Sequence, residues 1–132
     1  KIMLVTPFHE IEKELQDVQD YTDCHIDDDN ITTTEQRGNM LSVYLSRTAK
    51  LKADAKYHKN KKVNSEIMEQ MKKLLDLAPS SQSKMIDNLC ADENMLLEWA
   101  DRLNSVCTHQ LDWCRSLLSK QKEEMRNLNY GK

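Results

Sequence analysis

The sequence has 132 residues, of which 19 are Lys or Arg, 22 are Asp or Glu, and only 2 each are Gly and Pro. Because Gly and Pro supply most tight turns, this composition all but excludes a sheet protein. It also excludes nucleotide loops of the Rossmann or P-loop kind, which need clustered glycines. We therefore expect a single all-α unit in which a few helices are joined by few connections.

The apolar fraction is 39% and the charged fraction is 31%. These values are typical of long helices with a narrow apolar stripe and a large solvated surface. Such helices often complete their cores by association. The sequence therefore predicts an elongated helical hairpin or bundle of the coiled-coil kind that is completed by oligomerisation.

The first predicted element is an amphipathic helix that ends near residue 22. Thr6 is its expected N-cap and Pro7 its first helical residue. Apolar residues then recur at spacings of three and four: Phe8, Ile11, Leu15 and Val18. The aspartate-rich stretch 23–30 ends the helix, so residues 1–31 are interpreted as an acidic N-terminal helix and loop.

A long helix is predicted over residues 33–77, with Thr32 as its cap and Glu35 completing a capping box. Its apolar stripe consists of Met40, Leu41, Tyr44, Leu45, Thr48, Leu51 and Ala55. A second stripe, which begins at Val63, is shifted by about one residue. This shift predicts a stutter or a break between Lys59 and Asn64, near residues 60–64.

A short helix over 81–90 and a long helix over 93–128 complete the predicted helical core, residues 32–132. Asp92 is the expected N-cap of the last helix. At 1.5 Å per residue, that helix is about 54 Å long, which exceeds the width of a compact domain of this size. Six of its residues are predicted to pack in the core or at an oligomer interface: Leu96, Trp99, Leu103, Val106, Trp113 and Leu117.

The formal net charge of −3 conceals two opposite blocks. Residues 10–35 contain ten acids and one base, Lys13, which gives a charge of −9. Residues 47–62 contain seven bases and one acid, Asp54, which gives a charge of +6. This separation of charge is the main reason to expect a binding protein.

The basic block is a candidate nucleic-acid surface, because cations attract phosphates and interleaved aromatic rings can stack on unpaired bases. On a helix, Lys52, Lys56 and Lys59 share one face. The candidate contacts are Arg47, Lys50, Lys52, Lys56, Tyr57, Lys59, Lys61 and Lys62. Two other interpretations stay open: a solvated helix face, and an ion-pair interface with the acidic segment, which could also compete with nucleic acid.

No pattern in the sequence indicates catalysis, a metal site or a cofactor. Cys107 and His109 lie about 200° apart on a helix, so they cannot share one zinc ion, and Cys107 and Cys114 are interpreted as core residues. The lack of site motifs predicts a protein that is not an enzyme. No CxxC pair, signal peptide or long apolar run occurs, which predicts a protein of a reducing cytoplasm with no membrane segment.

Short matches over residues 40–132 point to a known family. They are Leu41, Leu45, Lys50, Lys52, Ala55-Lys56-Tyr57, Leu89-Cys90-Ala91-Asp92, Leu111-Asp112-Trp113-Cys114, Met125-Arg126 and Gly131-Lys132. In this order they resemble the UvsY-type recombination mediators of tailed phages. The acidic N-terminal segment has no counterpart in that family.

The resemblance implies a homo-oligomer that binds single-stranded DNA and helps to load a recombinase onto strands covered by single-strand-binding protein. It also implies a phage or prophage protein in the cytoplasm of a bacterial host. The alternative is a helical protein–protein interaction module without a nucleic-acid role: a scaffold, a chaperone or an acidic inhibitor.

Overall fold

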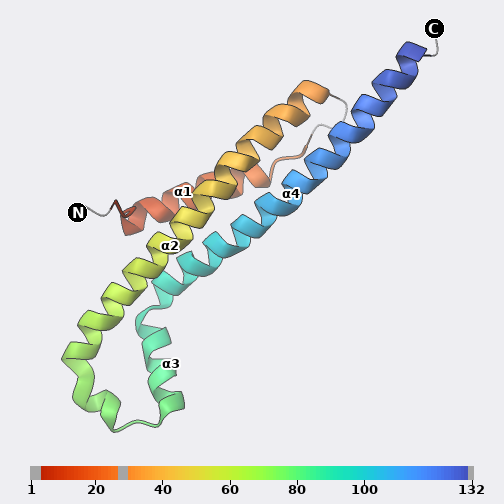
Figure 1. Cartoon of the computed structure of the whole chain (residues 1–132). Coiled ribbons are helices and arrows are strands. Elements are labelled where there is room, and N and C mark those ends of the chain that lie inside the picture. The colour runs from red at the N-terminus through yellow and green to blue at the C-terminus, as the bar shows by residue number, and fades with distance from the viewer. Residues whose placement is uncertain (1–3, 27–29, 131–132) are drawn as a thin grey trace.

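A computed structural model describes residues 4–26 and 30–130, except for the side chains of 67–74 and of residue 130. These residues form four helices and no strand: α1 (Phe8–Thr22), α2 (Ile31–Leu75), α3 (Pro79–Leu89) and α4 (Ala91–Tyr130). Figure 1 shows α2 and α4 running antiparallel as two long rods, with α3 in the connection between them. The prediction of an all-α fold with long helices is confirmed.

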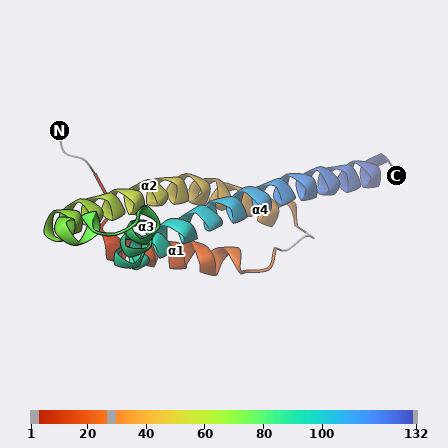
Figure 2. The ribbon, with the colours of Figure 1, turned by 90° about the horizontal axis from the view of Figure 1, so that it is seen from below.

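Helix α1 covers one side of the α2–α4 pair, as the view from below shows (Figure 2). Its buried apolar residues, Ile11, Leu15 and Val18, keep the predicted spacing. The helix begins one residue later than expected. Pro7 precedes it, and the Pro7 carbonyl accepts the N–H of Ile11 at 3.1 Å. Thr6 does not cap the helix, because its hydroxyl binds a carboxylate on α2.

Asn30 caps α2, so the predicted capping box of Thr32 and Glu35 is wrong. The Asn30 Oδ1 accepts the backbone N–H groups of Thr32 at 2.9 Å and of Thr33 at 3.3 Å. The side chain of Asn30 thus satisfies two of the N–H groups that a helix start leaves without intrahelical partners. The residues 27–29 that precede it, an acidic cluster in the sequence, lie outside the described residues.

Helix α2 continues without interruption through residues 60–64, so the predicted break is not found. Buried positions recur every seven residues along it, at Thr34, Leu41, Thr48 and Ala55. The next position in this series is Lys62, which is ion-paired to α4. The apolar stripe is interrupted in the sequence at residue 62 because a charged pair occupies this contact position.

Polar pairs set the register of α2 against α4. The Gln121 Nε2 donates to Thr34 Oγ1 at 3.1 Å near one end, and the Asn104 Nδ2 donates to Thr48 Oγ1 at 3.0 Å near the middle. A slip of one turn would leave these buried groups without partners, which is costly. Polar contacts at intervals thus specify one alignment of two helices whose apolar residues alone permit several.

Helix α3 begins at Pro79, two residues before the predicted helix start, and contains no buried residue. Helix α4 follows directly and begins at Ala91, so Asp92 lies in its first turn rather than before it. Helices α2 and α4 are 45 and 40 residues long. Even so, no helix in the described part of the chain is apolar enough over a sufficient length to cross a membrane.

The six predicted core or oligomer residues of α4 fall into two groups. Leu96, Leu103 and Leu117 are buried as expected. Trp99 is half-buried, and its Nε1 donates to Gln19 Oε1 of α1 at 3.0 Å. Val106 is exposed.

Trp113 is 55% exposed, so it does not pack in the core of one chain, and its place at an oligomer interface stays a prediction. The covered stripe of α4 is centred on Cys107 and Cys114, which are both buried. Trp113 is one residue away from Cys114, which turns its side chain by about 100° from that stripe.

Candidate nucleic-acid interface

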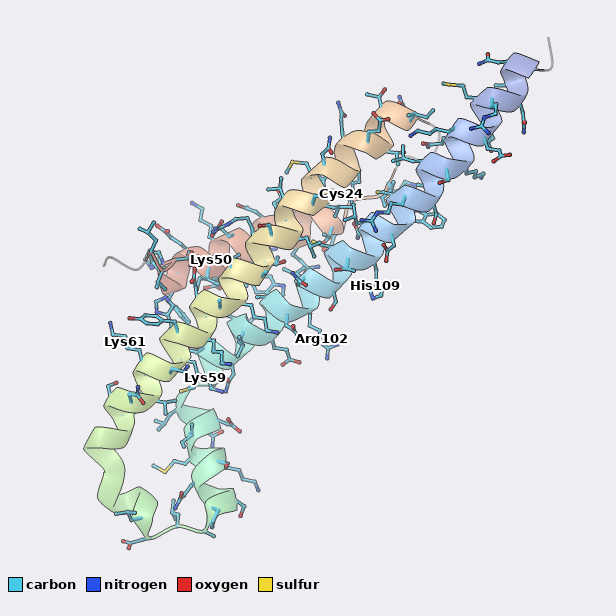
Figure 3. The ribbon with its side chains drawn as sticks, in the orientation of Figure 1. Cys24, Lys50, Lys59, Lys61, Arg102 and His109 are labelled. Carbon is cyan, nitrogen blue, oxygen red and sulfur yellow. The ribbon has the colours of Figure 1, made fainter. Side chains whose placement is uncertain are left out.

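The eight candidate contacts all lie on α2, which packs against both α1 and α4. These eight residues do not form one face, because the neighbouring helices bind different members. Figure 3 shows Lys59 and Lys61, two residues apart, pointing to opposite sides of α2. The contacts therefore divide into a group that faces α1, a group that faces α4, and a remainder.

Arg47 and Lys50 face α1 and the segment before it. The Arg47 Nη2 lies 2.8 Å from Glu14 Oε2 and 2.9 Å from Oε1, and the Arg47 Nε donates to Oε1 at 3.2 Å. The Lys50 Nζ donates to the Leu4 carbonyl at 2.8 Å and forms an ion pair with Asp54. Both cations thus bind the N-terminal part of the chain to α2.

Asp54 organises this attachment, although in the sequence it is only the single acid in a basic block. It is 3% exposed, and its Oδ2 accepts the N–H of Thr6 at 3.0 Å and the Thr6 hydroxyl at 2.7 Å. Burial raises the pKa of Asp54, but hydrogen bonds from Lys50 and Thr6 and the Lys50 charge outweigh it, and the net pKa is lowered. The His58 Nε2 lies 2.7 Å from the Thr6 carbonyl and completes the contact.

Lys52 and Lys62 face α4. The Lys52 Nζ lies 2.8 Å from Asp101 Oδ1, and both side chains are exposed. The Lys62 Nζ lies 2.9 Å from Glu93 Oε1, where Glu93 is buried. The hydrogen bond that Lys62 donates to Glu93 raises the pKa of Lys62 against the effect of burial. These two pairs join the helices across their long interface.

Lys56, Lys59 and Lys61 remain. In the part of the chain that the structure describes, no hydrogen bond or ion pair involves the side chains of these three residues. Tyr57 is 39% exposed, and its ring meets the ring of His58 edge-on at 5.8 Å. At about 100° per residue, Tyr57 lies between Lys56 and Lys61 on the outward side of α2.

The acidic segment does fold against the basic helix, but only in part. Among the described residues of α1, Glu14 alone forms an ion pair with a basic residue of α2. The acids Glu10, Glu12, Asp17 and Asp20 of α1 are exposed. The interpretation of the two charge blocks as one ion-pair interface therefore applies to Arg47 and does not extend to the three unpaired lysines.

No alternative chemical site emerges from the described residues, among which no group of three His, Cys, Asp or Glu side chains is placed to hold a metal ion. Burial raises the pKa of the Cys107 and Cys114 thiols, against a smaller effect of the Arg37 charge, so both thiols remain protonated and pack as core residues. His109 is exposed and points away from α2 (Figure 3).

A comparison with protein-family models gives no match, and comparisons with curated proteins and with solved structures give no significant match either.

Proposed function

We propose that the chain is an oligomeric helical accessory protein that binds single-stranded DNA without reading its sequence, in the manner of a recombination mediator. Its task is to help load a recombinase onto strands covered by single-strand-binding protein. The observation that supports DNA binding is the set of three lysines, Lys56, Lys59 and Lys61, that have no partner among the described residues. Lys56 and Lys61 flank the exposed ring of Tyr57, whereas Lys59 points to the opposite side of α2 from Lys61 (Figure 3).

The physical basis is the difference between free and paired cations. A lysine already bonded to a carboxylate gains little from a phosphate, whereas an unpaired lysine releases counterions from the nucleic acid when it binds. Tyr57 offers a face on which a base can stack, an interaction worth about 1–3 kcal/mol per base. Three such cations in one chain bind weakly, so an oligomer that presents the surface repeatedly is needed for useful affinity.

The test is the binding of a labelled oligo(dT) strand to the wild type and to a triple variant, K56Q/K59Q/K61Q, between 50 and 200 mM salt. A matched control, K84Q/K120Q/K122Q, removes the same charge from exposed lysines elsewhere. We expect the first variant to lose about tenfold or more in affinity at 50 mM salt and the control to lose little. Equal affinities of the two variants, or no binding by the wild type at 50 mM, would contradict the proposal.

A protein-interaction role is the second candidate, and the outward side of α4 favours it. Val106 and Trp113, seven residues apart, are exposed there, whereas Trp99, seven residues earlier, is half-buried against α1. Large aromatic residues at such positions are typical interface anchors. Light scattering of the wild type and of Trp113→Gln tests this role: a drop in mass for the variant supports it, and a monomeric wild type counts against the oligomer.

A further inference from the structure

A small open cavity lies beside the end of α1 and the first turns of α2. Figure 1 shows this end of α2 far from α3. The volume of the cavity is about 180 Å³. About 15 Å³ is enough to hold one water, so the cavity has room for a larger polar ligand. The residues that line it are Tyr21, His25, Ile26, Thr33, Gln36 and Arg37.

Arg37 is the unusual member of this lining, because it is only 7% exposed. Its Nη2 donates to the Cys24 carbonyl at 3.1 Å and to Gln110 Oε1 at 2.8 Å, and its guanidinium carbon lies 4.4 Å from the centre of the Tyr21 ring. All three partners are neutral. No carboxylate of the described residues pairs with Arg37, and its buried Nε has no hydrogen-bond partner.

A buried cation without an opposite charge is costly, and so is a buried N–H without an acceptor. The carbonyl at the end of α1 and the aromatic ring compensate Arg37 in part. The Cys24 carbonyl and Gln110 occupy Nη2, and Nε is buried, so Nη1 is the nitrogen of Arg37 that is left for an acceptor in the cavity. An anion at Nη1 would balance the buried charge.

The rest of the lining also suits an anion. Thr33 supplies a hydroxyl, Gln36 an amide and His25 an imidazole, and no hydrogen bond of these side chains occurs within the described part of the chain. Thr33 and Gln36 belong to the first two turns of α2, a helix of 45 residues. The N-terminal end of a helix carries a partial positive charge that favours anions.

We propose that this cavity binds an oxyanion of the phosphate type, held by the guanidinium of Arg37 and by the side chains of Thr33, Gln36 and His25. The Nη1 of Arg37 can donate a charge-assisted hydrogen bond to a phosphate oxygen, and such bonds are about twice as strong as those between neutral groups. The ligand is inorganic phosphate or a phosphate monoester, such as the 5′ end of a nucleic acid. This site is separate from the lysines that carry the proposed DNA contacts.

The first experiment measures the thermal unfolding midpoint of the full chain as inorganic phosphate replaces chloride at constant ionic strength. A ligand that binds only the folded state raises the midpoint by an amount that grows with the logarithm of its concentration above the dissociation constant. We expect a rise of about 5 °C at roughly tenfold the dissociation constant for a chain of this size. An equal midpoint in phosphate and chloride would overturn the proposal.

The variant Gln36→Glu identifies the site. It places a carboxylate beside Arg37, so we expect a higher midpoint without phosphate and at least a tenfold loss of apparent phosphate affinity. The control Asn39→Asp makes the same charge change one turn further along α2, at an exposed position, and keeps the phosphate response. Arg37→Gln is not needed, since it could fail to fold. A phosphate response that Gln36→Glu leaves unchanged would place the anion elsewhere and contradict the assignment.

Oligo(dT) with and without a 5′ phosphate separates the two sources of the ligand. Tighter binding of the phosphorylated strand to the wild type, lost in Gln36→Glu, supports the site and identifies a nucleic-acid end. Equal binding of both strands, together with the response to inorganic phosphate, supports the site and identifies a free anion. Binding of the unphosphorylated strand depends on Lys56, Lys59 and Lys61, so its loss concerns the proposed function and leaves the cavity unaffected.

Discussion

The two halves of the basic segment of α2 have similar composition and different uses. From Arg47 to Asp54, the cations are bonded to Glu14, Asp54 and Asp101 on neighbouring parts of the chain. From Lys56 to Lys61, the lysines have no carboxylate partner in the described residues. A basic residue that is paired with an acid of this chain thus stabilises the fold. Only a basic residue without such an acid is available to a ligand.

The largest expected effect is on the stability of the folded chain, through the half of the basic segment from Arg47 to Asp54. Asp54→Ala removes the acceptor shared by Lys50 and by the N–H and hydroxyl of Thr6. Buried groups left without a partner cost about 1–3 kcal/mol. We expect urea denaturation to show a loss of about 2–3 kcal/mol in the free energy of unfolding. Asp101→Ala, which removes an exposed partner, should change it little; equal losses would contradict the distinction.

The stability of this half should also depend on pH through Asp54. Its pKa is lowered in the folded chain, so its contribution is complete above its unfolded value of about 3.8 and is lost as the pH falls through the lowered pKa. Urea denaturation at pH values from 5 down to 2 should therefore show a steeper loss of stability for the wild type than for Asp54→Asn. Parallel curves would show that Asp54 does not titrate differently in the two states.

The Arg47–Glu14 pair should contribute less, because both side chains are about 40% exposed. Partly solvated ion pairs typically contribute about 0.2–1 kcal/mol. A double-mutant cycle with Arg47→Met and Glu14→Gln should yield a coupling of about 1 kcal/mol or less. A coupling of several kcal/mol would mean that α1 depends on this pair far more than its exposure suggests.

The smallest expected effect is on the affinity for oligo(dT) when one paired lysine, Lys52, loses its carboxylate partner. Asp101→Asn leaves Lys52 without its carboxylate while the helix face stays unchanged. We expect the affinity for oligo(dT) to rise a few-fold at 50 mM salt, with one additional phosphate contact in the salt dependence. The variant Asp112→Asn, which removes an exposed acid that pairs with Arg115, is the control and should give a smaller rise.

Much of the fold follows from periodicity in the sequence. The spacing of Ile11, Leu15 and Val18 predicts α1, and the low Gly and Pro content predicts the long rods. The continuity of α2 does not follow, because the contact position at Lys62 is charged and its partner Glu93 lies 31 residues away in the sequence. Periodicity does not identify which polar side chains meet across two helices.

The sequence predicts which segment carries the candidate site, but it does not predict which residues of that segment share a free surface. The pattern of charges locates residues 47–62, but the partners that neutralise four of its seven bases come from α1, α4 and the same helix. Asp54 and Arg37 carry no motif, so the sequence gives little sign that one attaches the N-terminus and the other lines a cavity. Heptad spacing assigns Trp113 to the core or to an oligomer interface, because it identifies a face of the helix without showing whether another helix covers it.

The most direct test of the division within the basic segment is the slope of oligo(dT) affinity against salt concentration. For single strands, each lysine that contacts a phosphate contributes about 0.7 to the magnitude of the logarithmic slope. Replacing Lys56, Lys59 and Lys61 by Gln should lower that magnitude by about 2 per chain engaged, and replacing Arg47 and Lys52 should lower it little in chains that remain folded. A slope that depends equally on both groups would contradict the account.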